Sequence, residues 1–350
     1  MKRLRITLGA VLLALAATPT MAQNLRIGLQ EDPDVLDPHR ARTYVGRIVF
    51  TSLCDKLVDI NSKLEFIPQL AQSWSWNADN TVLTFKLRTD ATFHDGAKFD
   101  AAAAKANLDR AMTLQDSLRK SELTSVAKVD APDAETLVLT LKQADATLIA
   151  QLSDRAGMML SPKTFNDQDP AAVGRAPVCS GPYKFVQRVQ NDRIVLEKFD
   201  GYYNTKDFAF KRLTFLPIPD TTVRLSNLRA GDLDIVERIN PSDAAQVKGD
   251  ANLTLSTVAG LGFQQFRFNV GNGERAKTSP FKDKRVRQAF QLILDRNVIN
   301  EVIGWRPVRT GAAAFPACQP LQQRQVPRDP AQRGQGKSTA EGSRCGAREG

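Results

Sequence analysis

Apolar residues recur at helical spacing near residue 290. They follow the order i, i+3, i+4, i+7 and i+8, which places them on one face of an α-helix. These residues are Val286, Ala289, Phe290, Ile293 and Leu294. Asp283 stands where an N-cap belongs, and Asp295 can cap a second short helix that ends before Gly304. The pattern predicts two consecutive helices, the first with a buried apolar stripe.

Upstream segments alternate between strand and helix patterns. Leu83, Phe85 and Leu87 alternate with polar residues, as in a half-buried strand, and Asp100 can cap a helix that reaches about Met112. Further strands are expected at residues 25–29, 56–60, 213–218, 233–236, 253–257 and 264–269, with hairpins over 125–141 and 183–196 and helices over 45–53 and 221–230. We therefore predict a mixed α/β fold with a βαβ unit over residues 213–236.

The periodic pattern ends after Gly304. The last 47 residues hold seven of the 21 glycines and five of the 18 prolines, and a single leucine. Such a segment buries too little apolar area to offset the entropy of ordering it. Two explanations remain open, namely an out-of-frame reading of GC-rich DNA and a native disordered basic tail.

The net charge of +10 is concentrated at the two ends of the chain. Residues 1–22 carry three basic and no acidic residues, and residues 304–350 carry eight basic and three acidic ones, so residues 23–303 carry only +2. A nucleic-acid-binding protein would carry its positive charge in the folded body. We therefore expect no nucleic-acid partner.

The first 22 residues have the pattern of a secretory signal peptide. A basic start with Lys2, Arg3 and Arg5 precedes an apolar stretch over residues 8–17, which is too short to span a bilayer. Thr20-Met21-Ala22 fits a small-x-small cleavage site. We expect cleavage after Ala22 and export to the periplasm; a retained membrane anchor is the alternative.

An exported chain can form disulfides. Of the four cysteines, Cys54 and Cys179 lie in well-patterned sequence and form the preferred pair, while Cys318 and Cys345 lie after Gly304. The alternative is two separately buried thiols. No cysteine or histidine spacing fits a metal site, so no metal and no cofactor is expected.

Five short motifs resemble those of the family 5 extracellular solute-binding proteins, the peptide- and nickel-type receptors of bacterial ABC importers. They are L-D-P-H at 36–39, P-Q-L-A-Q-S-W at 68–74, F-H-D-G at 93–96, P-V-C-S-G-P-Y at 177–183 and P-F-K-D-K-R-V-R-Q-A at 280–289. The resemblance covers about residues 25–303, in the family's order.

The resemblance implies a periplasmic-binding-protein-like fold of two lobes. Lobe I would span residues 23–258, lobe II would begin at 259–303, and residues 304–350 would be a disordered or out-of-frame tail that leaves lobe II incomplete. The chain would act as a monomeric receptor that closes on a peptide or similar small solute and delivers it to a membrane permease, with no chemistry performed.

The same resemblance places a ligand near Arg42, Thr43 and Tyr44, just after the first strand, and near Phe263 and Gln264, where the chain passes between lobes. Tyrosine can stack on or hydrogen-bond a peptide-like ligand, and arginine can pair with a carboxylate. A solvated helix face is the alternative for Arg42, and a buried strand for Gln264.

Two other functions were weighed. A secreted hydrolase would need a nucleophile beside a base, but the chain has only two histidines, His39 and His94, and neither lies in a hydrolase motif. We therefore expect no enzyme. An inactive, truncated product of the receptor family is the second alternative.

Overall fold

The structure, a computed structural model, describes residues 24–257 and 265–299. The chain comprises two compact units, Met1–Thr254 and Leu255–Gly350. The proposed signal peptide and the segment after Gly304 lie outside the described residues. The described part has a mixed α/β architecture, as the sequence predicts.

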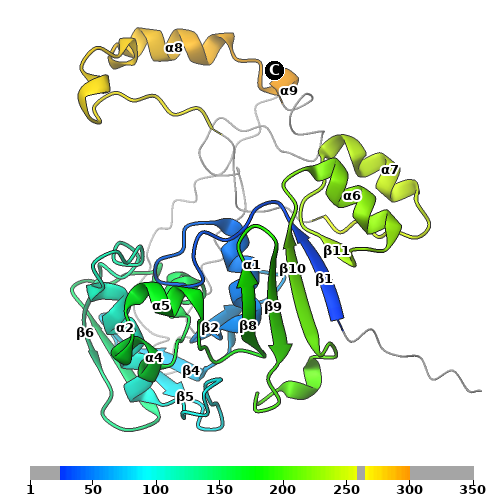
Figure 1. Cartoon of the computed structure of the whole chain (residues 1–350). Helices are drawn as coiled ribbons and strands as arrows, with labels where there is room; N and C mark the ends of the chain where they lie inside the picture. The colour runs from blue at the N-terminus through cyan, green and yellow to red at the C-terminus, as the bar shows by residue number, and fades with distance from the viewer. Residues whose placement is uncertain (1–23, 258–264, 300–350) are drawn as a thin grey trace, which may run out of the picture. The chain divides into compact units, whose positions relative to one another are not determined.

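A five-stranded sheet forms one half of the first unit (Figure 1). Its order is β11-β1-β10-β9-β8. The strands are β1 (Asn24–Leu29), β8 (Tyr183–Val189), β9 (Arg193–Lys198), β10 (Arg212–Pro217) and β11 (Ile235–Val236). β1 runs parallel to both β10 and β11, whereas β8, β9 and β10 pair antiparallel. Along β1 and β10 the register runs from Asn24 opposite Arg212 to Leu29 opposite Pro217.

The predicted βαβ unit is present, with one strand inserted. α6 (Thr221–Ala230) connects β10 to β11, and β1 lies between those two strands. Asp220 caps α6 by accepting from the backbone N–H of Val223 at 3.0 Å, and Gly231 ends it in the left-handed conformation with φ of 79°. β1 thus pairs with two strands that lie about 190 residues or more further along the sequence.

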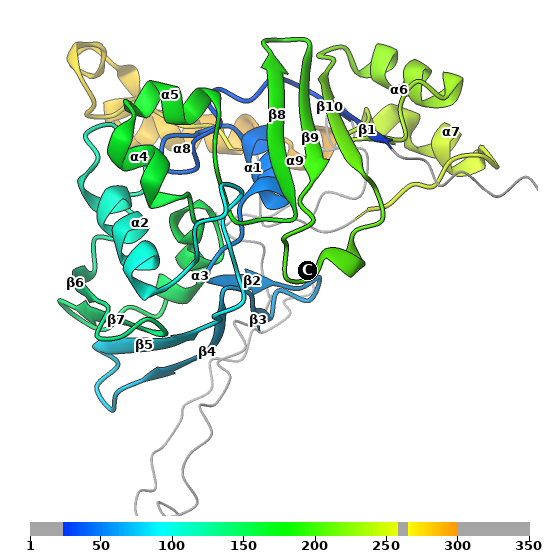
Figure 2. The same cartoon turned by 60° about the horizontal axis from the view of Figure 1, so that its bottom comes forward.

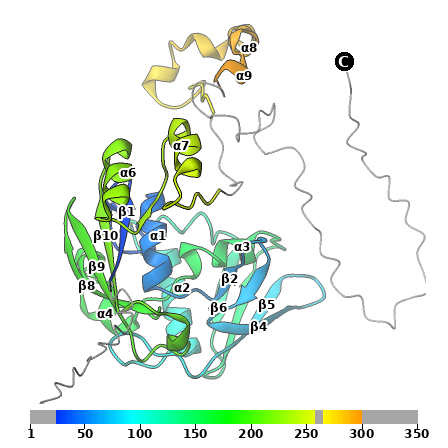
Figure 3. The same ribbon diagram turned by 90° about the vertical axis from the view of Figure 1, so that its right-hand side faces the viewer.

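One face of this sheet is covered by α1 (Tyr44–Leu53) (Figure 3). Its buried residues recur at helical spacing and pack against residues of β9 and β10 in one core. The helix contributes Val45, Val49, Phe50 and Leu53, and the strands contribute Ile194, Leu196, Leu213 and Phe215. This packing places the amino end of α1 beside the loop that follows β1.

The second half of the unit is a four-stranded antiparallel sheet in the order β4-β5-β7-β6, covered by α2 (Figure 2). These elements are α2 (Ala101–Thr113), β4 (Ala71–Trp76), β5 (Val82–Leu87), β6 (Val126–Asp130) and β7 (Thr136–Leu141). Asp100 caps α2 as predicted, by accepting from the N–H of Ala103 at 2.8 Å. Trp74 and Trp76 are partly buried against this core.

The remaining elements of the first unit are short. They are β2 (Val58–Ile60), β3 (Phe66–Pro68), α3 (Leu148–Leu152), α4 (Pro162–Asp167), α5 (Pro170–Arg175) and α7 (Ala244–Gly249), with 3-10 turns at Arg155–Gly157, Thr205–Asp207 and Pro241–Asp243. β2 and β3 form a separate antiparallel pair. Among the described residues, no helix has the length and apolar character needed to cross a bilayer.

In the second unit, the predicted helices form but the predicted burial does not. α8 (Lys284–Ile293) is capped by Asp283, and α9 (Arg296–Ile299) follows Asp295. Ile293 is nevertheless 80% exposed. Only the Phe290 end of the stripe finds partners, since its ring lies 5.1 Å from that of Phe268 and 6.1 Å from that of Phe281. Helical spacing identified the helix, but burial requires a second surface.

Two predicted strands before α8 are also wrong where they are described. Residues 253–257 and 265–269 have no regular structure. A strand exists only where another strand supplies hydrogen-bond partners. No described segment pairs with either stretch, so their alternating apolar residues were insufficient evidence.

Candidate ligand-binding site

The loop after β1 delivers three of the predicted site residues to the amino end of α1. The Asp34 carboxylate accepts from the backbone N–H of Arg42 at 2.9 Å and from the hydroxyl of Thr43 at 3.1 Å. Thr43 is the N-cap of α1 and accepts from the N–H of Gly46 at 3.3 Å. Arg42 is exposed and Tyr44 is 53% exposed, so both are available to a ligand.

The Asp34 carboxylate is kept charged in this position. Burial alone would raise its pKa, but hydrogen bonds from the N–H groups of Arg42 and Val35 and from Thr43 bring the pKa below its ordinary value. The loop that carries Arg42 and Thr43 is therefore fixed by a carboxylate that stays ionised well into acid.

Deeper in the same loop, the L-D-P-H motif has a structural role. Arg110 of α2 forms a bidentate ion pair with Asp37, at 3.1 Å from Nη1 to Oδ1 and 2.7 Å from Nη2 to Oδ2. Arg110 Nη1 also lies 2.9 Å from Nδ1 of His39, which therefore acts as an acceptor. His39 is fully buried, and burial lowers its pKa to about 4. The motif thus joins the loop to α2.

Two buried arginines hold the backbone of this loop. Arg155 Nη1 donates to the carbonyl oxygens of Ala41 at 3.0 Å and Thr43 at 3.4 Å, and Arg119 Nη2 donates to that of Ala41 at 3.2 Å. Arg119 is 4% exposed and Arg155 is 9% exposed. These bonds satisfy carbonyl groups that regular structure leaves unpaired.

Positive charge exceeds negative charge around these bonds. Arg119 forms an ion pair with Glu122, and Arg47 of α1 forms one with Asp154. Arg155 adds a third guanidinium, whose Nε lies 3.9 Å from the same Asp154 carboxylate. Three cations therefore share two carboxylates. Next to them, the exposed Arg42 adds a fourth cation and the ionised Asp34 a third carboxylate, which leaves one positive charge in excess.

The hydrogen-bonding capacity of the three arginines is also incompletely used. The Nε atoms of Arg47, Arg119 and Arg155 are buried without a hydrogen-bond partner. Burial lowers the pKa of Arg155, and its neighbour Arg119 lowers it further. Burial likewise raises the pKa of Glu122, against the effect of Arg119. An anion bound at the accessible edge of these residues, where Arg42 is exposed and the Arg47 side chain is partly exposed, would offset the excess charge.

Tyr44 completes this surface. The guanidinium carbon of Arg47 lies 5.9 Å from the centre of the Tyr44 ring, within the range of a cation–π contact. Residues three apart on a helix lie on the same face, so Tyr44 and Arg47 present an aromatic ring and a cation together. This combination suits a solute that has an anionic group beside an apolar or planar part.

The structure describes three of the five ligand-binding residues that the sequence predicts. Arg42, Thr43 and Tyr44 do lie together at the start of α1, whereas Phe263 and Gln264 lie outside the described residues. Arg47 could have been found from its spacing to Tyr44. Nothing local marks Arg119 and Arg155, because only the fold brings them to residues 41–43. We refer below to Arg42, Tyr44, Arg47, Arg119 and Arg155 as the arginine cluster.

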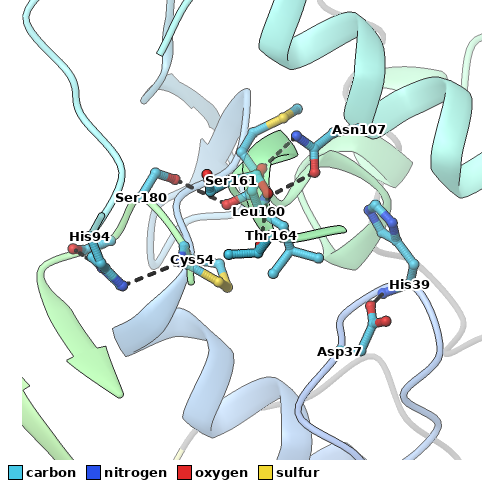
Figure 4. The surroundings of a disulfide bond; sticks show 12 residues. Asp37, His39, Cys54, His94, Asn107, Leu160, Ser161, Thr164 and Ser180 are labelled. Carbon is cyan, nitrogen blue, oxygen red and sulfur yellow. Dashed lines mark hydrogen bonds between the residues drawn. A yellow bond between two sulfur atoms is a disulfide. The ribbon is translucent and has the colours of Figure 1, made fainter. Parts of the chain in front are cut away.

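The other end of α1 is tied down by a disulfide. The predicted pair Cys54 and Cys179 is bonded in the structure, and Figure 4 shows His94 beside it. The N–H of Cys179 donates to Nδ1 of His94 at 3.2 Å, so Nε2 carries the ring proton and donates to Gly181 O at 3.0 Å. Burial lowers the pKa of His94 to about 4, which keeps the ring neutral.

The segment that carries Cys179 pairs with residues 160–161, which are fixed by further hydrogen bonds. Asn107 of α2 exchanges two hydrogen bonds with the backbone of Leu160, at 2.8 and 2.9 Å (Figure 4). The Ser161 hydroxyl donates to Asp95 at 2.7 Å. Leu160 in turn bridges to Cys179. Within the described residues, no group of three histidine, cysteine or acidic side chains could hold a metal ion.

Comparisons with known proteins agree with one another. A family model described as bacterial extracellular solute-binding proteins, family 5 Middle, matches residues 65–332, a range that extends beyond Gly304. The glutathione-binding protein GsiB of Escherichia coli is 28% identical over 298 residues, which are 85% of this chain and 57% of GsiB. The chain therefore spans just over half the length of this relative.

Solved structures show the same fold. The periplasmic binding protein DppA of Helicobacter pylori, in complex with the peptide STSA, superposes with a TM-score of 0.76 at 22% identity, over 84% of this chain and 60% of DppA. The binding protein AgaA of A. tumefaciens, in complex with agropinic acid, gives a TM-score of 0.61 at 29% identity, over 65% of this chain and 46% of AgaA.

Proposed function

Because the chain belongs to the family 5 bacterial extracellular solute-binding proteins, we propose that it is a solute receptor of an ABC importer. It binds a small solute that carries a carboxylate, at the arginine cluster at the amino end of α1. Binding is followed by closure of two lobes and delivery to a membrane permease. The signal-peptide pattern of residues 1–22 supports a periplasmic location.

The observation that carries this proposal is the excess of guanidinium groups at the arginine cluster. Three arginines share Glu122 and Asp154, and each keeps a buried Nε without a hydrogen bond. Guanidinium groups bind carboxylates through paired, charge-assisted hydrogen bonds. A carboxylate on the solute completes the charge balance that the protein leaves open.

The ligands named for two related proteins support a peptide-like solute. GsiB is named for glutathione, and the DppA structure holds a peptide. Both ligands carry carboxylates on a flexible, peptide-like body. We therefore place this chain's ligand among peptides and similar small acids, with Tyr44 against its body and Arg42 and Arg47 at its carboxylate.

The proposed role requires no catalysis. Both histidines are buried with a pKa of about 4; His94 uses both ring nitrogens in contacts within the fold, and His39 uses Nδ1. Neither is placed to act as a base toward a bound solute. The receptor would work by binding and release, as a monomer that meets its permease at the membrane.

Thermal unfolding of the purified chain with candidate ligands tests the proposal. The ligands are glutathione, short peptides and the same peptides with an amidated C-terminus. We expect a carboxylate ligand at a hundredfold excess over its Kd to stabilise the chain by about 2.7 kcal/mol, and the amide to stabilise it less.

Two variants localise the site. Arg47→Ala should weaken binding at least tenfold, since it removes a charge-assisted contact worth about 1.5–3 kcal/mol. Arg229→Ala is the matched control, because Arg229 is a partly exposed arginine of α6 whose described ion pair is with Asp250 at 3.7 Å. Equal loss in both variants would place the ligand elsewhere. No stabilisation by any ligand would support the inactive-product alternative.

A further inference from the structure

A buried carboxyl group lies where the two cores of the first unit meet. Asp55 is 1% exposed. Cys54 before it belongs to the core beneath the five-stranded sheet, and Leu57 after it belongs to the core beneath the four-stranded sheet. The backbone of Asp55 also accepts from the N–H of Met159 at 3.0 Å. The side chain is therefore enclosed by segments from both halves of the unit.

Three donors converge on this carboxyl group. The hydroxyl of Tyr203 lies 2.7 Å from Oδ2, the hydroxyl of Tyr202 lies 3.3 Å from Oδ1, and Nε2 of Gln69 lies 3.0 Å from Oδ1. The tyrosines belong to the connection between β9 and β10, whereas Gln69 precedes β4. These hydrogen bonds link that connection to the segment that leads into β4, beside the packing of Tyr203 on the core of the four-stranded sheet.

The nearby cations are committed to other carboxylates. Arg88 lies over the Tyr203 ring, with its guanidinium carbon 3.1 Å from the ring centre, and forms a 2.7 Å ion pair with Asp90. Lys56 pairs with Asp59. No cation forms a direct ion pair with Asp55 among the residues that the structure describes.

Burial consequently dominates the ionisation of Asp55. It raises the pKa of the carboxyl group to about 7, although hydrogen bonds from Tyr203 and Tyr202 and the charges of Arg88 and Lys56 act in the opposite direction. Burial and the neighbouring Asp55 also raise the pKa of both tyrosines above the ordinary value, so the hydroxyls stay protonated.

We propose that Asp55 forms a pH-dependent contact between the two sheets of this unit, which holds when its carboxyl group is neutral and opens when it is ionised. We call this contact the latch. In its neutral form the carboxyl group is compatible with a dry site and holds the connection between β9 and β10 in place. Loss of its proton to solvent leaves a buried charge without a paired cation. Water must then enter, which separates Tyr202 and Tyr203 from the second sheet.

The geometry specifies what protonation changes. In the ionised form both carboxyl oxygens can only accept, which suits all three donors. In the neutral form one oxygen becomes a donor, so the hydroxyl that faces it must turn and accept. Tyrosine hydroxyls can do this and amide NH₂ groups cannot. The proton therefore resides on the side of Tyr203 or Tyr202, and Gln69 keeps its bond.

Hydrogen–deuterium exchange of residues 199–208 tests the latch in the full chain. After correction for intrinsic base catalysis, we expect protection to fall about tenfold between pH 6 and pH 8, as a group with a pKa near 7 loses its proton. Asp55→Asn, which stays neutral, should abolish this dependence. Asp130→Asn removes a partly exposed carboxylate that pairs with Lys128 on β6, leaves Arg88 and Lys56 with their partners, and should preserve the dependence.

A second measurement covers the case in which Asp55→Asn folds poorly. Tyr203→Phe removes a donor that stabilises the ionised form, so the transition in exchange should move to higher pH by a measurable amount. Exchange that is independent of pH in the unmodified chain, or equally dependent in the Asn variant, would overturn the proposal. So would an unchanged transition in Tyr203→Phe.

Discussion

The guanidinium of Arg155 donates from Nη1 to the carbonyl oxygen of Ala41 at 3.0 Å, across 114 residues of sequence. This bond fixes the backbone immediately before the exposed Arg42 and Tyr44. A long, buried, charged side chain is thus used to support a loop, while part of its own hydrogen-bonding capacity stays unfilled. Both properties suit a binding surface that must be rigid and electropositive.

Arg155→Met should destabilise the chain by about 1–3 kcal/mol, because it removes the donor to Thr43 O and leaves the Ala41 carbonyl with only the longer bond from Arg119 among the described residues. Arg155→Lys should lose nearly as much, since an ammonium group cannot reproduce the planar fork. Urea unfolding measures both. Arg193→Met, at a half-exposed arginine, should change stability by less than about 0.5 kcal/mol. A Lys variant as stable as the parent would show that only charge matters.

Removal of the disulfide should lower the stability of the fold. Cys54 and Cys179 are 125 residues apart, are both buried, and join the end of α1 to the segment beside β8. Replacing both with alanine should lower the free energy of unfolding by about 2–5 kcal/mol. The matched measurement is unfolding of the parent chain with and without reductant. If the double variant equals the oxidised parent, the bond contributes no stability.

Local sequence signals were sufficient to predict helices that have a capping residue at their start. The caps at Asp100 and Asp283 could be predicted because each acts on the backbone within three or four residues. Hairpins were equally accessible, since short turns bring neighbouring strands together. Family motifs added the broad fold, which periodicity by itself did not establish.

Contacts between residues that lie far apart in the chain could not be predicted from the sequence. The insertion of β1 between β10 and β11 depends on a segment about 190 residues away. The stripe that ends at Ile293 has helical spacing but no described partner surface. Arg119 and Arg155 resemble any solvated arginine in the sequence. In each case the determining quantity is which surface lies opposite, and this arises only from tertiary packing.

Alanine substitutions at two glycines should show the cost of backbone strain in the absence of side-chain clashes. Gly231 has φ of +79°, and nothing lies within 4 Å of a Cβ placed there. Gly231→Ala should therefore cost about 1 kcal/mol through the backbone alone. Gly249 at the end of α7 is equally open but has ordinary φ, so Gly249→Ala should be neutral or stabilising by up to about 1 kcal/mol. Chemical denaturation of the pair measures the difference, and equal effects would contradict it.

Acid should destabilise the chain through its histidines. The neutral ring of His94 uses both nitrogens, accepting from Cys179 and donating to Gly181. Its pKa is about 4 in the fold and 6.5 ordinarily, so between these values the unfolded chain binds the extra proton. This contribution to stability is complete above pH 6.5 and is lost as the pH falls toward 4. His39, with a pKa of about 4, acts in the same direction, whereas Asp55 opposes both.

His94→Gln isolates one of these contributions, because its amide can still donate to Gly181 but does not titrate. We expect the variant to lose up to about 1.4 kcal/mol per pH unit from the slope of stability against pH between 4 and 6.5, which corresponds to one proton. Denaturant unfolding at five pH values provides the slope. Asp55→Asn should steepen the same slope, because it removes a group that the folded chain protonates more readily. Parallel slopes in the parent and His94→Gln would mean that His94 is protonated equally in both states.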